Sequence, residues 1–240
     1  MDKDDITFKL KLNLPIEIDG VRKFAVPVLR TVVEWGEARY NEAISALLFD
    51  KSQHEAFIPF HEDNYAVMCL LFESDQRYRR ALDDAFLLLF KSSLQLQRRE
   101  EGASFYIEVE QEKRLISREQ MESIRQVVRI AHFIEEKKLE YKPANNAAQK
   151  MIELINRNKR DRPSRKTATN LQSIVSGIAW KSGSINLLNI TDLTIYQIYD
   201  GYYRLHTIDD CNHTFTGIYS GAIDSKKIKL SEINWAAIPN

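Results

Sequence analysis

The segment from Ser184 to Asp210 constrains the fold of this chain more than any other, because it has the densest apolar and aromatic pattern. Its sequence is SINLLNITDLTIYQIYDGYYRLHTIDD. Thr191 or Asp192 can cap a helix here by accepting a hydrogen bond from a free backbone N–H of the first turn. The apolar residues that follow cover more of the helix surface than one narrow stripe; they are Leu193, Ile195, Tyr196, Ile198, Tyr199, Tyr202, Tyr203 and Leu205. Such a helix must be buried on two sides or must contact a partner.

The two apolar sides of this helix suggest two roles. We predict that Leu193, Ile195, Ile198, Tyr202 and Leu205 face the core and that Tyr196, Tyr199 and Tyr203 face a partner. Tyrosine is enriched at interface hot spots, although tyrosine at helical spacing also packs in cores with its hydroxyl group at the rim. Trp180 and Trp235 are further candidate partner contacts. A C-terminal unit this short has little mass to bury two helix faces, so it either docks on the N-terminal domain or faces another chain.

The chain opens with a pattern of alternating apolar and polar residues. Residues 6–18 alternate with a period of two, which predicts a half-buried strand with a bend at Pro15. Asp19-Gly20 is typical of a type I′ hairpin turn, with residues 21–26 as the returning strand. Helical spacing begins after Pro27, with a break at Gly36.

Residues 62–142 continue the same domain. The spacing predicts helices over 62–73 and 75–96, followed by a second hairpin over 104–116. Ser117 and Gln120 have the spacing of a capping box, which predicts a further amphipathic helix. We therefore predict an α+β fold, mostly helical, with two short β-hairpins in an N-terminal domain of residues 1–142.

The C-terminal part is predicted to be a small, mainly helical domain. Residues 143–168 hold a helix and a basic linker, and residues 169–240 form the C-terminal domain, whose first helix Thr169 or Asn170 can cap. We expect the tail from His213 to Trp235 to be an irregular, partly extended return.

A run of basic residues marks the linker. It contains Arg157, Lys159, Arg160, Arg162, Arg165 and Lys166. Such a cluster can bind phosphates, and these residues are the candidate nucleic-acid contacts. Lysine plus arginine equals aspartate plus glutamate at 34 each, and no aromatic residue lies between Tyr141 and Trp180 for stacking. These observations favour a solvated linker over a nucleic-acid contact.

Motifs for catalysis and for bound cofactors are missing from the sequence. It contains no G-x-S-x-G, G-x-x-x-x-G-K-[ST] or H-E-x-x-H pattern. Cys211 and His213 make one pair of potential metal ligands, but a structural zinc site needs a second pair. We expect no enzyme activity, no metal and no cofactor. The acidic N-terminus predicts no signal peptide, and no apolar run of about 20 residues predicts a membrane span.

Several motifs resemble proteins of tailed bacteriophages and prophages. They are S-I-N-L-L-N-I-T-D-L-T-I-Y-Q-I-Y-D-x-Y-x-R-L at 184–205, residues 174–181, G-I-Y-S-G-A-I-D-S-K-K-I at 217–228, I-x-I-D-G-V at 16–21 and W-G-x-x-x-Y-N at 35–41. The resemblance covers about half of the chain. It implies a morphogenesis protein similar to tail assembly chaperones, which binds tape-measure or tail-tube proteins, or itself as a homo-oligomer, in the cytoplasm of the infected bacterial host.

Other functions remain open at this stage. The chain can instead be a minor structural component of the phage tail or connector, and then it would stay in the virion. A third alternative is a nucleic-acid-associated regulator that uses the basic linker.

Overall fold

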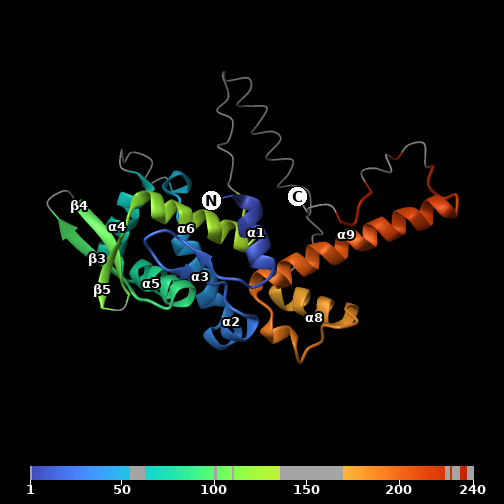
Figure 1. Ribbon diagram of the computed structural model, residues 1–240, viewed down its shortest axis with the longest axis horizontal. Helices are drawn as coiled ribbons and strands as arrows, with labels where there is room; N and C mark the ends of the chain where they lie inside the picture. Colours follow the sequence, from blue (N-terminus) through green and yellow to red (C-terminus); the bar gives the residue numbers. More distant parts are fainter. Residues whose placement is uncertain are drawn as a thin grey trace, which may run out of the picture.

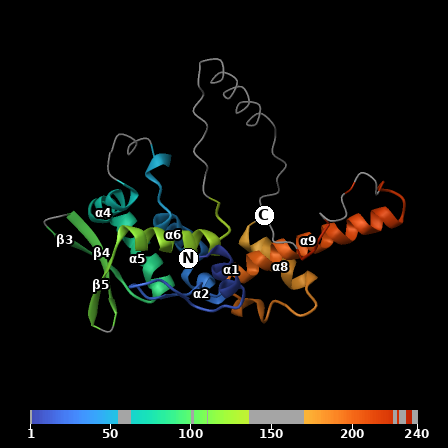
Figure 2. The same ribbon diagram turned by 45° about the horizontal axis from the view of Figure 1, so that its top comes forward.

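The fold is α+β with helices predominating, as the sequence predicted. The computed structural model describes residues 2–54, 63–99, 102–109, 111–135, 170–224, 228 and 233–236. Helices surround the core of the N-terminal part, a three-stranded sheet lies at one end, and the C-terminal helices lie at the other (Figure 1). The same arrangement is visible in the rotated view (Figure 2).

The N-terminal part contains most of the elements. The helices are α1 (Lys3–Lys11), α2 (Leu29–Trp35), α3 (Glu37–Leu47), η1 (Lys51–Gln53), α4 (Asn64–Ser74), α5 (Gln76–Phe90) and α6 (Arg118–Ala131). The strands are β1 (Ile16–Glu17), β2 (Lys23–Phe24), β3 (Leu94–Arg99), β4 (Gly102–Val109) and β5 (Glu112–Ile116). The C-terminal part contains α8 (Leu171–Lys181), η3 (Ile190–Asp192) and α9 (Ile195–Tyr219).

The first predicted strand is wrong, because the segment forms helix α1. Ile6 and Leu10 lie one helical turn apart and are both buried, whereas Phe8 is exposed. Asp2 caps the helix, with acidic residues in its first turn and basic residues in its last, as the helix dipole favours. A spacing of four residues satisfies both the helical period and the period of two, so alternation alone did not decide between them.

The first hairpin forms, but its turn is wider than predicted. Ile16 pairs with Phe24, so residues 18–22 lie between the strands and not a two-residue turn. Gly20 has a φ of +75°, which favours glycine, and the Gln120 side chain donates a 2.7 Å hydrogen bond to the Asp19 carbonyl. A Cβ atom at Gly20 would lie 2.6 Å from Gln120 Nε2. The backbone of the turn therefore favours glycine, and any larger residue there would also have to displace the end of the Gln120 side chain.

The second hairpin is confirmed and gains a third strand. β3, β4 and β5 form an antiparallel sheet in that order. The helix predicted over 75–96 ends at Phe90, because Lys91 takes a left-handed conformation with φ of +56°. Leu94 and Leu96 then pair with Ile107 and Phe105. The strand was missed because Leu94 and Leu96 continue the apolar pattern of α5 and were therefore assigned to the helix.

The end of α9 also differs from the prediction. The tail was expected to be irregular from His213, but α9 continues as a helix to Tyr219. The helix begins at Ile195 because Thr194 forms a capping box with Gln197, so neither Thr191 nor Asp192 is the cap. The predicted caps at Asn170 for α8 and Ser117 for α6 are confirmed.

Buried side chains from both parts of the chain form one hydrophobic cluster. It includes Ile6 and Val32 from the N-terminal part and Ile174, Ile195 and Ile198 from the C-terminal part. The C-terminal helices therefore dock on the N-terminal part. The predicted boundaries at 142 and 169 fall outside the described residues and stay a prediction.

Candidate partner interface

The start of α9 is attached to the N-terminal part through main-chain hydrogen bonds. The Leu29 N–H donates to the Leu193 carbonyl at 2.8 Å, and the Ile195 N–H donates to the Pro27 carbonyl at 3.1 Å. These bonds flank an antiparallel bridge between Val28 and Thr194. The geometry holds the segment before α9 like a short strand and sets where the helix begins.

Side chains reinforce this attachment. Gln197, already part of the capping box, donates from Nε2 to the Lys11 carbonyl at 3.0 Å. Arg30 reaches Thr191 Oγ1 at 3.0 Å and Asp192 Oδ1 at 2.9 Å, so the two residues expected to cap the helix instead bind α2. The Asp192 carboxylate raises the pKa of Arg30 further. This ion pair is exposed and adds little stability on its own.

An aromatic cluster joins α9 to the end of α6. The ring of Phe133 lies 5.2 Å from that of Tyr196, 5.1 Å from that of Tyr203 and 6.3 Å from that of Tyr199, centroid to centroid. Tyr202 packs edge-on against Tyr203 at 5.3 Å. Tyrosines from successive turns thus gather around one phenylalanine.

The predicted split of the α9 tyrosines is wrong for Tyr196. Only 2% of Tyr196 is exposed, and burial raises its pKa above the ordinary value. Tyr199 and Tyr203 are half-buried against Phe133. The face expected to meet a partner is largely occupied by this chain, and whether Tyr199 or Tyr203 also binds a partner stays a prediction. The sequence did not reveal Phe133 as their neighbour.

A buried histidine lies beside this cluster. The Tyr40 hydroxyl and His132 Nε2 are hydrogen-bonded, and His132 Nδ1 lies 2.7 Å from the Val128 carbonyl. A carbonyl only accepts, so Nδ1 carries the proton and Nε2 accepts from Tyr40. Burial lowers the pKa of His132 to about 4, which keeps the ring neutral. The pair packs α3 against α6 without a charged group.

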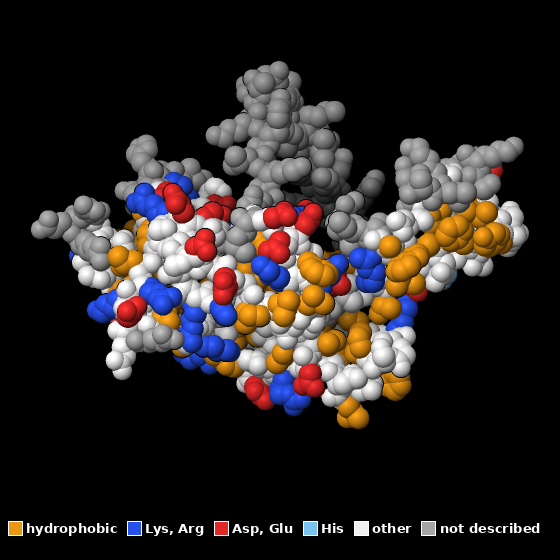
Figure 3. Space-filling model, viewed as in Figure 1, with side chains coloured by type: hydrophobic (Ala, Val, Ile, Leu, Met, Phe, Trp, Pro, Cys, Tyr) orange, Lys and Arg blue, Asp and Glu red, His pale blue; other side chains and the backbone are white. Residues whose placement is uncertain are grey.

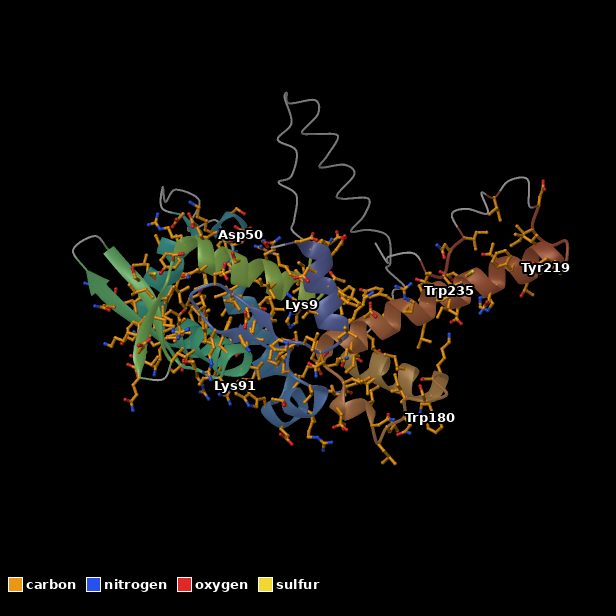
Figure 4. All side chains as sticks on the ribbon, in the orientation of Figure 1. Lys9, Asp50, Lys91, Trp180, Tyr219 and Trp235 are labelled. Carbon is orange, nitrogen blue, oxygen red and sulfur yellow. The ribbon has the colours of Figure 1, made fainter. Side chains whose placement is uncertain are left out.

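The exposed apolar side chains of the C-terminal part lie away from the aromatic cluster. Trp180 is 80% exposed and Leu188 is 89% exposed, and Leu187 is exposed beside it. Trp180 lies on α8 opposite the buried Leu171, Ile174 and Ile178 (Figure 4). The sequence analysis named Trp180 but neither leucine. The feature that could have indicated them is a pair of adjacent apolar residues within a polar loop.

A second set of exposed apolar side chains follows the outer half of α9. Tyr219 is 84% exposed at the free end of the helix, and Trp235 lies back along it, where Arg204 Nη1 donates to its carbonyl at 2.6 Å (Figure 4). Ile223 folds onto Gly217, and its N–H donates to the Gly217 carbonyl at 3.0 Å. The space-filling view shows hydrophobic side chains gathered along this half of α9 (Figure 3). The predicted partner contact Trp235 is thus at the surface, and Tyr219 is a further exposed aromatic residue that the sequence analysis did not name.

Polar residues near α9 lie close to oppositely charged or polar neighbours. His206 Nε2 lies 3.4 Å from Asp210 Oδ2, and Lys181 forms an ion pair with Asp209. No three histidine, cysteine, aspartate or glutamate side chains in the described ranges come close enough together to hold a metal ion. The candidate nucleic-acid contacts from Arg157 to Lys166 lie outside the described residues. None of the described helices is both long and apolar enough to cross a membrane.

The comparison with protein families points to phage. Residues 159–239 match the family model of the YomV second domain, which belongs to a phage- and prophage-type family. The match covers roughly a third of the chain and includes all of α8, η3 and α9. It indicates a phage-associated protein, as the resemblance implied, and does not extend to tail assembly. No curated protein and no solved structure matches the chain.

Proposed function

We propose that this chain is a non-enzymatic phage protein that acts in virion assembly by binding a tail protein through its C-terminal part. The observation that carries the proposal is the exposure of Trp180 and Leu188 within the region that matches the phage-associated family. Large apolar side chains at such exposure are typical of surfaces that bind other proteins. Tape-measure and tail-tube proteins are the candidate partners.

The docking of α9 suits this role. Main-chain bonds at Leu193 and Ile195 and the ring contacts at Phe133 keep the start of the helix in one position. A partner that binds Trp180 and Leu188 therefore meets a surface that needs little reordering, and the conformational cost of binding is small. The N-terminal part would then act as a rigid support.

Co-purification tests the proposal. The full-length chain is tagged and expressed during infection, and captured phage proteins are identified by mass spectrometry. We expect a tail protein to co-purify with the natural sequence and to be lost with Trp180→Ala combined with Leu188→Ala. The matched control is Val33→Ala, which removes an exposed apolar side chain on α2. Capture that survives the double substitution in a folded protein would contradict the proposal.

Purified virions separate the assembly factor from a structural component. An assembly factor is absent from finished particles, whereas a tail or connector component is present in a fixed ratio to the other tail proteins. The same double substitution should then reduce its incorporation.

A further inference from the structure

The outer edge of β3 lacks a neighbouring strand in the described part of the chain. β3 pairs with β4 alone. The Leu94 N–H points away from β4, because it donates to Asp83 Oδ1 at 2.8 Å. Backbone groups alternate between the two edges of a strand, so the N–H and C=O groups of Leu96 and Arg98 also point outward.

Two other hydrogen bonds support this assignment. The Glu108 carbonyl accepts from Ser92 Oγ at 2.9 Å and so points toward the β3 side of β4. The Phe105 N–H donates to the Tyr65 hydroxyl at 3.0 Å, on the β5 side, where that hydroxyl group bonds the Ile116 carbonyl. The backbone N–H and C=O groups of the even-numbered residues of β4 therefore point toward β3. They bond the backbone groups of the odd-numbered residues of β3 that are paired with them. Among the residues that the structure describes, no backbone partner reaches the outward groups of Leu96 and Arg98.

A groove of about 650 Å³ runs beside this edge, between β3 and helices α4 and α5. Phe72, Leu94 and Leu96 supply its apolar lining, and Arg79, Arg80 and Arg98 supply guanidinium groups. An open strand edge with an adjoining groove is the arrangement that proteins use to bind an extended segment as an additional strand.

The charges in the groove favour an acidic segment. Glu73 is paired with Arg98 at 2.6 Å, whereas among the described residues the Asp83 carboxylate accepts only from the neutral Ser93 hydroxyl and Leu94 N–H; three arginines against two carboxylates leave the groove with a net charge of +1. The guanidinium of Arg79 donates to the carbonyls of Phe72 and Glu73, lies 5.5 Å from the centre of the Phe72 ring and attracts the Glu73 carboxylate, so its charge is partly compensated.

Arg80 is the arginine of the groove whose charge is least compensated. It is exposed, and it has no partner in the described part of the chain. Basic side chains are also visible over the end of the molecule that holds α5 and the sheet (Figure 3).

The same charges disfavour pairing between two copies of this chain. Antiparallel contact of two β3 edges would bring together two grooves that each hold three arginines and two carboxylates, so the net positive charge of one groove would face that of the other. Like charges placed against each other oppose association. A second copy is therefore a poorer occupant than an acidic segment of another protein.

We propose that the open edge of β3 and its groove bind an extended acidic segment of another polypeptide by strand addition. The backbone of the segment pairs with Leu96 and Arg98, its apolar side chains contact Phe72 and Leu96, and its carboxylates pair with Arg79 and Arg80. The site lies at the opposite end of the molecule from Trp180 (Figure 4), so it goes beyond the proposed function. Substitutions that abolish binding at one of the two surfaces therefore leave binding at the other surface to be measured separately.

A peptide experiment tests the proposal on the full-length chain. The probe is a fluorescent eight-residue peptide that alternates glutamate and valine, and the control probe alternates lysine and valine. We expect the acidic probe to bind and the basic probe not to bind. Charge reversal by Arg80→Glu should weaken binding at least about tenfold, since it replaces attraction by repulsion. The matched control is Lys3→Glu, which changes the net charge equally on α1 and should leave binding unchanged.

Hydrogen exchange provides the second readout. The acidic probe should slow exchange of the Leu96 and Arg98 amides and leave the already bonded Leu94 amide unchanged. Equal binding of both probes, insensitivity to Arg80→Glu or unchanged exchange at Leu96 and Arg98 would each overturn the proposal. A concentration-dependent dimer that protects those amides without peptide would also overturn it, in favour of self-pairing.

Discussion

The ring of Phe133 stacks on the ring of Tyr196, with centroids 5.2 Å apart and an interplanar angle of 23°. Phe133 directly follows the cap of α6 and has a φ of +54°, a left-handed conformation that bulky residues rarely adopt. The next residue, Ile134, donates its N–H to the Arg129 carbonyl at 2.9 Å and so closes the helix end. The turn places the aromatic ring against α9, and the ring contacts offset the backbone strain.

Substitutions at Phe133 should separate these two effects. Phe133→Ala should lower the free energy of unfolding by about 2 kcal/mol, because it removes the contacts with three tyrosines. Phe133→Gly removes the same ring but relieves the left-handed strain, so it should be about 1 kcal/mol more stable than the alanine variant. Urea unfolding measures both values. An alanine variant as stable as the glycine variant would show that the turn is not strained.

The buried His132 should make stability depend on pH. The pKa of His132 is about 4 in the folded protein, compared with the ordinary histidine value of 6.5. The unfolded chain therefore binds more protons between these values, so stability is fully present above pH 6.5 and is lost as the pH falls toward 4. His132→Gln removes this titration, and its unfolding free energy should change less than that of the natural sequence from pH 7 to pH 4.5. Parallel curves for the two proteins would refute the assignment.

The ion pair between Arg39 and Asp84 should matter more than an exposed one. Asp84 is buried and accepts two hydrogen bonds of 2.6 Å from Arg39, which joins α3 to α5. Asp84→Asn should cost about 2 kcal/mol, since the bidentate charged contact is lost in a buried site. The exposed pair of Asp5 with Lys9 is the matched control, and Asp5→Asn should cost less than about 0.5 kcal/mol. Equal effects in thermal unfolding would contradict this ranking.

The Gly20 turn should be sensitive to one added methyl group. Gly20→Ala should destabilise the fold by about 2 kcal/mol, because it combines a positive φ with a contact at Gln120. In a Gln120→Ala background the contact is gone, so the same change should cost only the backbone part, about 1 kcal/mol. A double-mutant cycle by chemical denaturation measures the difference. A cost that is unchanged in the second background would mean that Gln120 moves away freely.

Much of the local structure was predictable. Ser117 with Gln120 and the cap at Asn170 each involve residues within one turn, so the chain carries the whole signal locally. The helix break at Gly36 and the hairpin of β4 and β5 are local in the same sense. The α+β class followed from these elements together.

The elements that were misassigned share one property. In α1, Ile6 and Leu10 fit a helix and a strand equally well, and their burial in the core adds to the local helix signals of the Asp2 cap and the charged end turns. In β3, the strand is stabilised by pairing with Phe105 and Ile107 on β4. The secondary structure of both segments depends on contacts with residues outside the segment, and the intrinsic propensities of its own residues do not include such contacts.

The aromatic segment by itself determined that α9 would be a helix with two apolar sides and that it would need more than its own domain to cover them. Only the tertiary structure decided which side is covered. Phe133 lies 5.2 Å from Tyr196 in space but far from it in sequence, and it occupies the side that the tyrosine pattern reserved for a partner. Trp180 and Leu188 remain at the surface because no part of the described chain packs over them. The sequence pattern shows which side chains are apolar, whereas contacts with distant segments decide which of those side chains are buried.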